Sequence, residues 1–130
     1  MMLPKGTTVA VADGEKLNLF RNAGDEAQLQ LSPLEHGHVS EAHGSRQTTS
    51  GNPDPGQASE DGFSAGIVDL LNKGVLEGKI HGLVVIAAPR ALGEMRKHYH
   101  KTLSAKLLGE IAKDLTGHGV GDIETAIRGA

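Results

Sequence analysis

Residues 83–88 form the sequence feature that most restricts the fold of this chain. They are a continuous run of small and aliphatic residues (LVVIAA), bounded by Gly82 and Pro89. A strand with apolar side chains on both faces must be covered on both faces, which is typical of a central strand in a sheet flanked by helices. The run therefore predicts a layered α/β protein with a buried central strand.

Residues 7–12 are small or β-branched, and apolar and polar residues alternate at 17–20 and 27–34, so these three segments of the first quarter of the chain predict strands. Asp13-Gly14 separates the first two strands and indicates a hairpin, because both residues tolerate a positive φ. Residues 22–25 are typical of a second turn. We therefore expect a three-stranded antiparallel meander with one partly hydrated face.

Residues 36–60 interrupt this periodicity and contain Val39 as their only large aliphatic residue. Such a segment cannot bury enough apolar area to offset the entropy of ordering it, so we expect a flexible loop that is either functional or merely tolerated. Helical spacing then predicts a helix that begins near Ser59, another that begins at Pro89 and includes Tyr99, and a short final helix. The spacing of apolar residues within 106–115 fits a helix better than a strand.

Composition excludes several kinds of site. The chain has no cysteine, which rules out disulfides and cysteine-ligated metals, and aromatic residues make up only 2% of it, which argues against a base-stacking platform. The net charge of −3 gives the whole molecule no attraction for phosphate polymers. The 130 residues fit one domain, residues 1–130, without a secretory or membrane-length apolar segment. We expect a soluble cytoplasmic protein with no membrane partner and no DNA partner.

The motifs of common enzyme classes are also missing. Neither a phosphate-binding loop ending in Lys-Ser/Thr nor a Gly-x-Ser-x-Gly motif is present. Histidines 36, 38 and 43 lack carboxylate partners at fixed spacing, so we expect no metal and no cofactor. Asp13, Asp69 and Asp114 belong to separate elements with no sign that they converge, which argues against a nuclease.

A cationic segment follows the apolar run and contains Arg90, Arg96, Lys97, Lys101 and Lys106. Its first member lies where the buried strand gives way to a helix, at the strand end where open α/β sheets bind ligands. This placement predicts a binding site for RNA phosphate or another anion. The alternative is a solvated helix face whose cations only contact water.

Three blocks of sequence resemble the bacterial "protein required for attachment to host cells" family, which is distantly similar to the middle domain of archaeal and eukaryotic release factors. They are residues 3–16, 87–97 and 110–118, in the order found in that family. The resemblance implies an RNase H-like arrangement, with a mixed sheet of about five strands, and a strand over residues 107–113. Family members usually carry an arginine-rich central segment, whereas Arg46 is the only arginine of this loop.

Release-factor middle domains carry a Gly-Gly-Gln loop before a helix, and Pro55-Gly56-Gln57 precedes Phe63 at a comparable distance. The resemblance makes Gln57 a candidate catalytic residue, although the fixed φ of Pro55 disfavours the required loop. Our first hypothesis is a non-enzymatic or weakly active module that binds the ribosome or tRNA through Arg90, Arg96, Lys97, Lys101 and Arg46. The alternatives are a peptidyl-tRNA hydrolase-like rescue factor using Gln57, and a protein-interaction factor that supports attachment.

Overall fold

The computed structural model describes residues 1–37, 39 and 55–130, with the side chains of 55–58 left out. Its strands are β1 (Thr8–Ala12), β2 (Leu17–Asn22), β3 (Leu31–Leu34), β4 (Leu83–Ala87) and β5 (Leu107–Ala112). Its helices are α1 (Pro55–Leu76), α2 (Pro89–Arg96), α3 (Lys101–Lys106) and α4 (Val120–Arg128).

The five strands form one mixed sheet in the order β3-β2-β1-β4-β5. β1 and β2 are antiparallel, as are β2 and β3, whereas β4 is parallel to both β1 and β5. Every residue of β1 and β4 is buried, since both strands are internal and both faces of the sheet are covered. The predictions of a buried internal strand, of a mixed sheet of about five strands and of a strand near residues 107–113 are confirmed.

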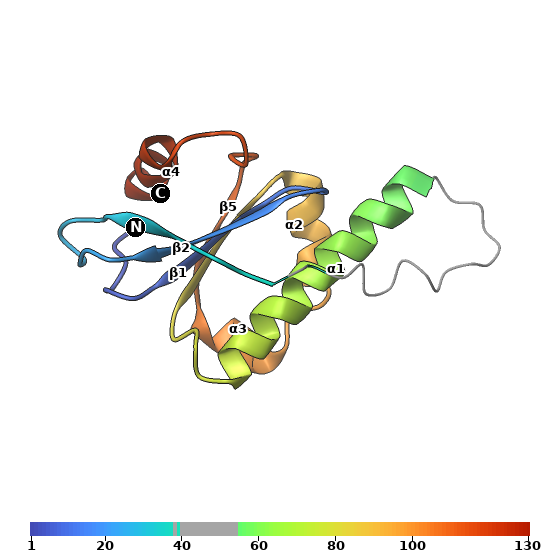
Figure 1. The fold of residues 1–130 in the computed structure, drawn as a ribbon, viewed down its shortest axis with the longest axis horizontal. Coiled ribbons are helices and arrows are strands. Elements are labelled where there is room, and N and C mark those ends of the chain that lie inside the picture. The colour runs from blue at the N-terminus through green and yellow to red at the C-terminus, as the bar shows by residue number, and fades with distance from the viewer. Residues whose placement is uncertain (38, 40–54) are drawn as a thin grey trace.

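Different elements cover the two faces of the sheet (Figure 1). One core contains the apolar sides of α1, α2 and α3, with Leu71, Leu92 and Leu103 packed against alternate residues of β1 and β4. The other contains Ile123 and Ile127 of α4 together with the N-terminal segment. The two termini meet there, because the Met1 amino group donates a 2.7 Å hydrogen bond to the carbonyl oxygen of Ala130. No described helix is long and apolar enough to span a lipid bilayer.

The first hairpin is present, but its turn differs from the prediction. Gly14 does not adopt a positive φ; instead the Asp13 carboxylate accepts hydrogen bonds of 2.7 Å from the backbone N–H groups of Glu15 and Lys16. This arrangement is an Asx turn, in which a side chain replaces the backbone partner. The turn after β2 is also longer than predicted, because Asp25 bonds back to Gln28 and β3 therefore begins at Leu31.

The boundaries of the predicted loop and of the second helix need correction. α1 begins at Pro55, so residues 55–60 are helical rather than part of the loop, and the expected flexibility of residues 38 and 40–54 lies outside the described residues. Val39 is buried in the core that contains α1. The helix from Pro89 ends at Arg96, and Tyr99 lies in the turn before α3.

Candidate functional site

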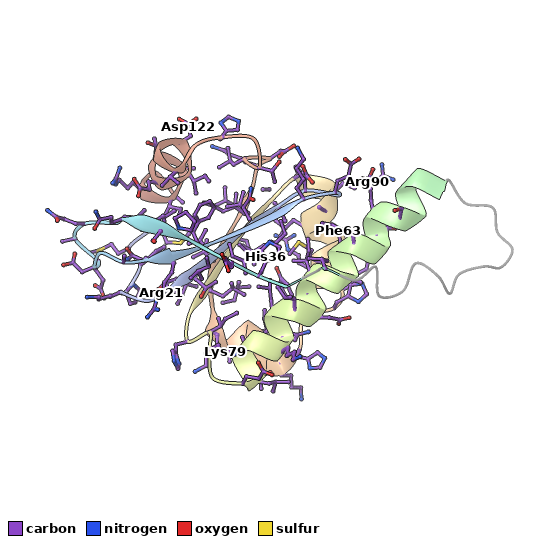
Figure 2. The ribbon with its side chains drawn as sticks, in the orientation of Figure 1. Arg21, His36, Phe63, Lys79, Arg90 and Asp122 are labelled. Atoms are coloured by element: carbon purple, nitrogen blue, oxygen red, sulfur yellow. The ribbon has the colours of Figure 1, made fainter. Side chains whose placement is uncertain are left out.

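The parallel strands β1, β4 and β5 end at the same edge of the sheet, which we call the carboxyl edge. Pro89 follows β4 as the first residue of α2, and the extended conformation of Ala88 (φ −54°, ψ 144°) suits a residue that precedes proline. Arg90 is exposed on the first turn of α2 (Figure 2). The fold therefore places Arg90 where the sequence predicted it, beside the carboxyl end of an internal strand.

Arg96 lies at the other end of α2 and forms an ion pair. Its Nε and Nη2 atoms lie 3.0 Å and 2.9 Å from Oε1 of Glu110 on β5. The other oxygen of Glu110 accepts a 2.8 Å hydrogen bond from the Tyr99 hydroxyl. Burial raises the pKa of Tyr99, and the Glu110 carboxylate raises it further, so the hydroxyl remains a donor. The Arg96 charge is thus neutralised within the fold.

Lys97 is also paired, through a shared acidic partner. Its Nζ lies 3.0 Å from Oε1 of Glu94, and the other oxygen of Glu94 lies 3.1 Å from Nε2 of His98. Burial disfavours the charged form of Glu94, but hydrogen bonds from Lys97 and His98 outweigh it and lower the pKa of this carboxyl group. The same two residues, Glu94 and Lys97, line a cavity of about 380 Å³ together with Asp61, Arg90 and Gly93.

Lys101 is exposed at the start of α3, and its position depends on the turn that joins α2 to α3. The buried amide of Asn72 on α1 fixes this turn, because it donates to the carbonyl of His98 and accepts from the backbone N–H of His100, both at 3.2 Å. Among the described residues, the ion pairs of the cationic segment involve Arg96 and Lys97 and include neither Arg90 nor Lys101. The segment is therefore less cationic than its sequence suggested.

Two carboxylates that were expected to remain apart meet at the carboxyl edge. Oγ1 of Thr116 lies 2.9 Å from Oδ2 of Asp13 and 2.8 Å from Oδ1 of Asp114. Partial burial opposes ionisation of Asp13, but the N–H groups of Glu15 and Lys16 and the Thr116 hydroxyl outweigh it and lower its pKa. Asp69 is exposed on α1. Within residues 1–37, 39 and 55–130, no group of three histidine or acidic side chains could hold a metal ion.

The remaining predicted site residues lie on or near the central segment. Gln57 belongs to the first turn of α1, so its backbone is helical and does not form the glycine-rich loop that the catalytic hypothesis required. The side chain of Gln57 and the whole of Arg46 lie outside the part of the chain that the structure describes.

The fold also brings together basic side chains that sequence reasoning did not connect. Lys5, Arg21, Lys79 and His81 line a cavity of about 460 Å³ at the opposite edge of the sheet, which we call the amino edge. Figure 2 shows Arg21 and Lys79 at this edge, far from Arg90. These residues come from separate segments with no common spacing, so no sequence signal could have identified them.

The comparison with protein families gives a match over almost the whole chain. The family described as "Bacterial archaeo-eukaryotic release factor family 12" matches residues 6–127. The chain belongs to this family. The release-factor similarity expected from the sequence blocks is confirmed, whereas the host-attachment description is not supported by the match. No curated protein matches the chain.

Membership in release factor family 12 points to a role related to translation. The matched residues 6–127 run from β1 to the last turn of α4, and so include both the carboxyl edge and most of the residues that line the amino-edge cavity. It gives no reaction, because the family description names neither a substrate nor a catalytic residue. An RNase H-like classification of the fold stays a prediction.

Proposed function

We propose that this release-factor-like chain is a non-catalytic module that binds RNA of the translation apparatus through exposed cations of α2 and α3. The observation that carries the proposal is the release factor family match over residues 6–127. The ribosome and tRNA are the phosphate-rich partners that release factors meet, and exposed arginine and lysine side chains are the usual donors to phosphate oxygens.

Arg90 and Lys101 are the cations best suited to this contact. Both are exposed, and both lie outside the ion pairs formed between described residues. Lys97 contributes less because Glu94 already lies 3.0 Å away. Arg96 makes two hydrogen bonds to Glu110, and so would exchange an internal partner for a phosphate.

The helical conformation of residues 55–57 supports a binding role over a hydrolytic one. A glutamine that positions water at an ester needs a backbone able to present it beyond the end of a helix, and a proline-led helical turn does not provide such a loop. Replacement of Gln57 is therefore expected to leave RNA binding unchanged.

The test is co-sedimentation of the purified chain with bacterial ribosomes over a series of salt concentrations. The variant Arg90→Ala/Lys101→Ala is compared with Lys73→Ala/Lys113→Ala, which removes two positive charges from exposed lysines outside α2 and α3. Removal of one cation that binds a phosphate should reduce the slope of log affinity against log salt by about 0.7 for single-stranded RNA. We expect a weaker and less salt-dependent interaction for the first variant only.

Two outcomes would contradict the proposal. If the chain does not sediment with ribosomes even at low salt, RNA binding is wrong. If both double variants lose binding equally, the interaction responds to net charge, and Arg90 and Lys101 do not form its site. A Gln57→Ala variant in the same assay tests the hydrolytic alternative, since a change in its binding would favour that alternative.

A further inference from the structure

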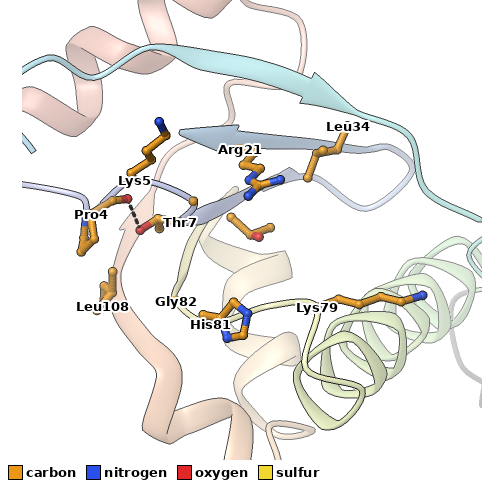
Figure 3. Close-up of a pocket in the computed structure, with 11 residues that line it drawn as sticks. Pro4, Lys5, Thr7, Arg21, Leu34, Lys79, His81, Gly82 and Leu108 are labelled. Atoms are coloured by element: carbon orange, nitrogen blue, oxygen red, sulfur yellow. Dashed lines mark hydrogen bonds between the residues drawn. The ribbon is translucent and has the colours of Figure 1, made fainter. Parts of the chain in front are cut away.

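The amino-edge cavity lies where β1, β4 and β5 begin. Residues 4–8, the loop between α1 and β4, and single residues of β2, β3 and β5 form its walls (Figure 3). Its volume of about 460 Å³ is in the range of small-molecule sites. Backbone hydrogen bonds fix its floor, because the Gly6 N–H donates to Asn22 at 2.8 Å and the Thr8 N–H donates to Gly82 at 2.9 Å.

The charged residues that line this cavity are all cationic. They are Lys5, Arg21 and Lys79, His81 adds an imidazole group, and none of the described lining residues is acidic. Lys79 lies 3.4 Å from Glu77 and is highly exposed, which places its ammonium group at the rim. Figure 3 shows Arg21 and His81 on opposite sides of the space. A chain with a net charge of −3 thus concentrates positive charge in one concave site.

Arg21 is positioned by the turn beneath it. Gly6 has a φ of +89°, and a Cβ atom added there would lie 3.8 Å from Nη2 of Arg21. The guanidinium group therefore lies close to the backbone of the turn that also carries Lys5. A guanidinium can donate two parallel hydrogen bonds to one phosphate group, which makes arginine a preferred phosphate ligand.

A buried hydroxyl group in the cavity wall has no hydrogen-bond partner among the described residues. It belongs to Thr8, which is only 4% exposed and lines the cavity. Its neighbour Thr7 differs, because it donates a 2.8 Å hydrogen bond to the carbonyl of Pro4. Buried polar groups usually have a hydrogen-bond partner, so the Thr8 hydroxyl indicates a polar ligand or water at this position.

The sides of the cavity are apolar. Leu34 and Leu108 line it and are 37% and 47% exposed, and the described chain contains only two other large hydrophobic residues with such exposure. Pro4 adds a further apolar surface. Cations beside exposed aliphatic side chains favour a ligand with an anionic group attached to a less polar organic group.

We propose that the amino-edge cavity binds a nucleoside phosphate through its terminal phosphate monoester, either as a free nucleotide or as the 5′ end of an RNA chain. Arg21 and Lys5 contact the phosphate, His81 and Thr8 donate further hydrogen bonds, and Leu34 and Leu108 contact the nucleoside. This site lies at the opposite edge from Arg90 and does not depend on the proposed ribosome contact.

The test is a titration of the ¹⁵N-labelled full chain followed by NMR, with AMP, adenosine and inorganic phosphate as separate ligands. We expect AMP to shift the amide signals of Gly6, Thr8 and Gly82 and to bind at least ten times more tightly than adenosine. Adenosine binding as tightly as AMP would overturn the phosphate contact. Inorganic phosphate binding as tightly as AMP would overturn the nucleoside contact.

The variant Lys5→Gln/Arg21→Gln should weaken AMP binding at least tenfold. Its matched control is Lys16→Gln/Lys113→Gln, which removes the same charge from exposed lysines near the carboxyl edge. Unshifted signals elsewhere in the spectrum would show that each variant is folded. Equal AMP affinity in the two variants would overturn the site.

A second pair of ligands distinguishes the two sources of the phosphate. A hexaribonucleotide with a 5′ phosphate is compared with the same RNA ending in a 5′ hydroxyl. Tighter binding of the phosphorylated RNA than of AMP supports an RNA end, whereas tighter binding of AMP supports a free nucleotide. Equal binding of the two RNAs, together with no binding of AMP, would overturn the proposal.

Discussion

Asn22 offers a quantitative test of how the amino edge is built. Its side chain is fully buried at the end of β2 and joins three segments of the chain. Nδ2 donates to the carbonyl of Leu3 at 2.9 Å, while Oδ1 accepts from the N–H groups of Gly24 and Gln30 at 3.0 Å and 3.1 Å. Replacement by alanine therefore removes the side-chain partner of three backbone groups.

Each such hydrogen bond contributes about 1 kcal/mol net to stability, so Asn22→Ala should lower the free energy of unfolding by about 3 kcal/mol. That is a large fraction of the roughly 5–15 kcal/mol typical of a folded domain. Urea unfolding followed by circular dichroism measures the change. Asn18→Ala is the control, because Asn18 is exposed and makes one 3.3 Å hydrogen bond to Thr116.

Asn22→Asp separates hydrogen bonding from shape. Aspartate has the same shape and can still accept from Gly24 and Gln30, but it presents an acceptor and a buried negative charge to the carbonyl of Leu3. We expect it to be at least as destabilising as Asn22→Ala near neutral pH. A loss of stability below about 1 kcal/mol in Asn22→Ala, or wild-type stability in Asn22→Asp, would refute the reasoning.

Two further predictions concern the ion pairs of α2 and the Asp13 carboxylate. The variant Glu94→Gln/Glu110→Gln releases Lys97 and Arg96 from their ion pairs, so it should tighten ribosome binding and steepen its salt dependence. Unchanged co-sedimentation would show that these two cations do not bind RNA. Thr116→Val removes a hydrogen-bond donor to Asp13. Because folding lowers the pKa of Asp13, its ionised form stabilises the fold above about pH 4, and this stabilisation is lost as the pH falls through the lowered pKa. Carbon NMR titration should show the Asp13 pKa rising toward its ordinary value in Thr116→Val, and not in Thr125→Val, which removes a hydrogen bond within α4.

Sequence patterns predicted the elements in which the spacing of apolar residues matches the period of the strand or helix that they form. The aliphatic run of β4 and the spacing of Ile123 and Ile127 in α4 are examples, since each repeats with the period of its own element. The spacing of apolar residues was misleading at residues 106–115. Leu107, Leu108 and Ile111 have a helical spacing, yet they lie on the edge strand β5, into which α3 passes directly. Family resemblance corrected this error.

The start of α1 was missed for a different reason. Pro55, Gly56 and Gln57 have the composition of a loop, yet they form the first turn of a 22-residue helix. Packing of Ile67, Leu71 and their neighbours against the sheet stabilises this helix, and such tertiary interactions commonly override weak local propensity. The sequence therefore placed the core of the helix correctly and its beginning too late.

Charge was the least predictable property of the two edges. The cationic segment was visible in the sequence, but its partner Glu110 lies on β5 and becomes adjacent only when α2 packs beside that strand. The amino edge shows the converse, because Lys5, Arg21 and His81 are scattered in sequence and gather at one cavity. The net charge of −3 averages over both edges and so conceals a site whose described lining residues include no carboxylate. Since binding depends on the local field rather than on net charge, the amino edge is as strong a candidate for phosphate recognition as the edge that the sequence indicated.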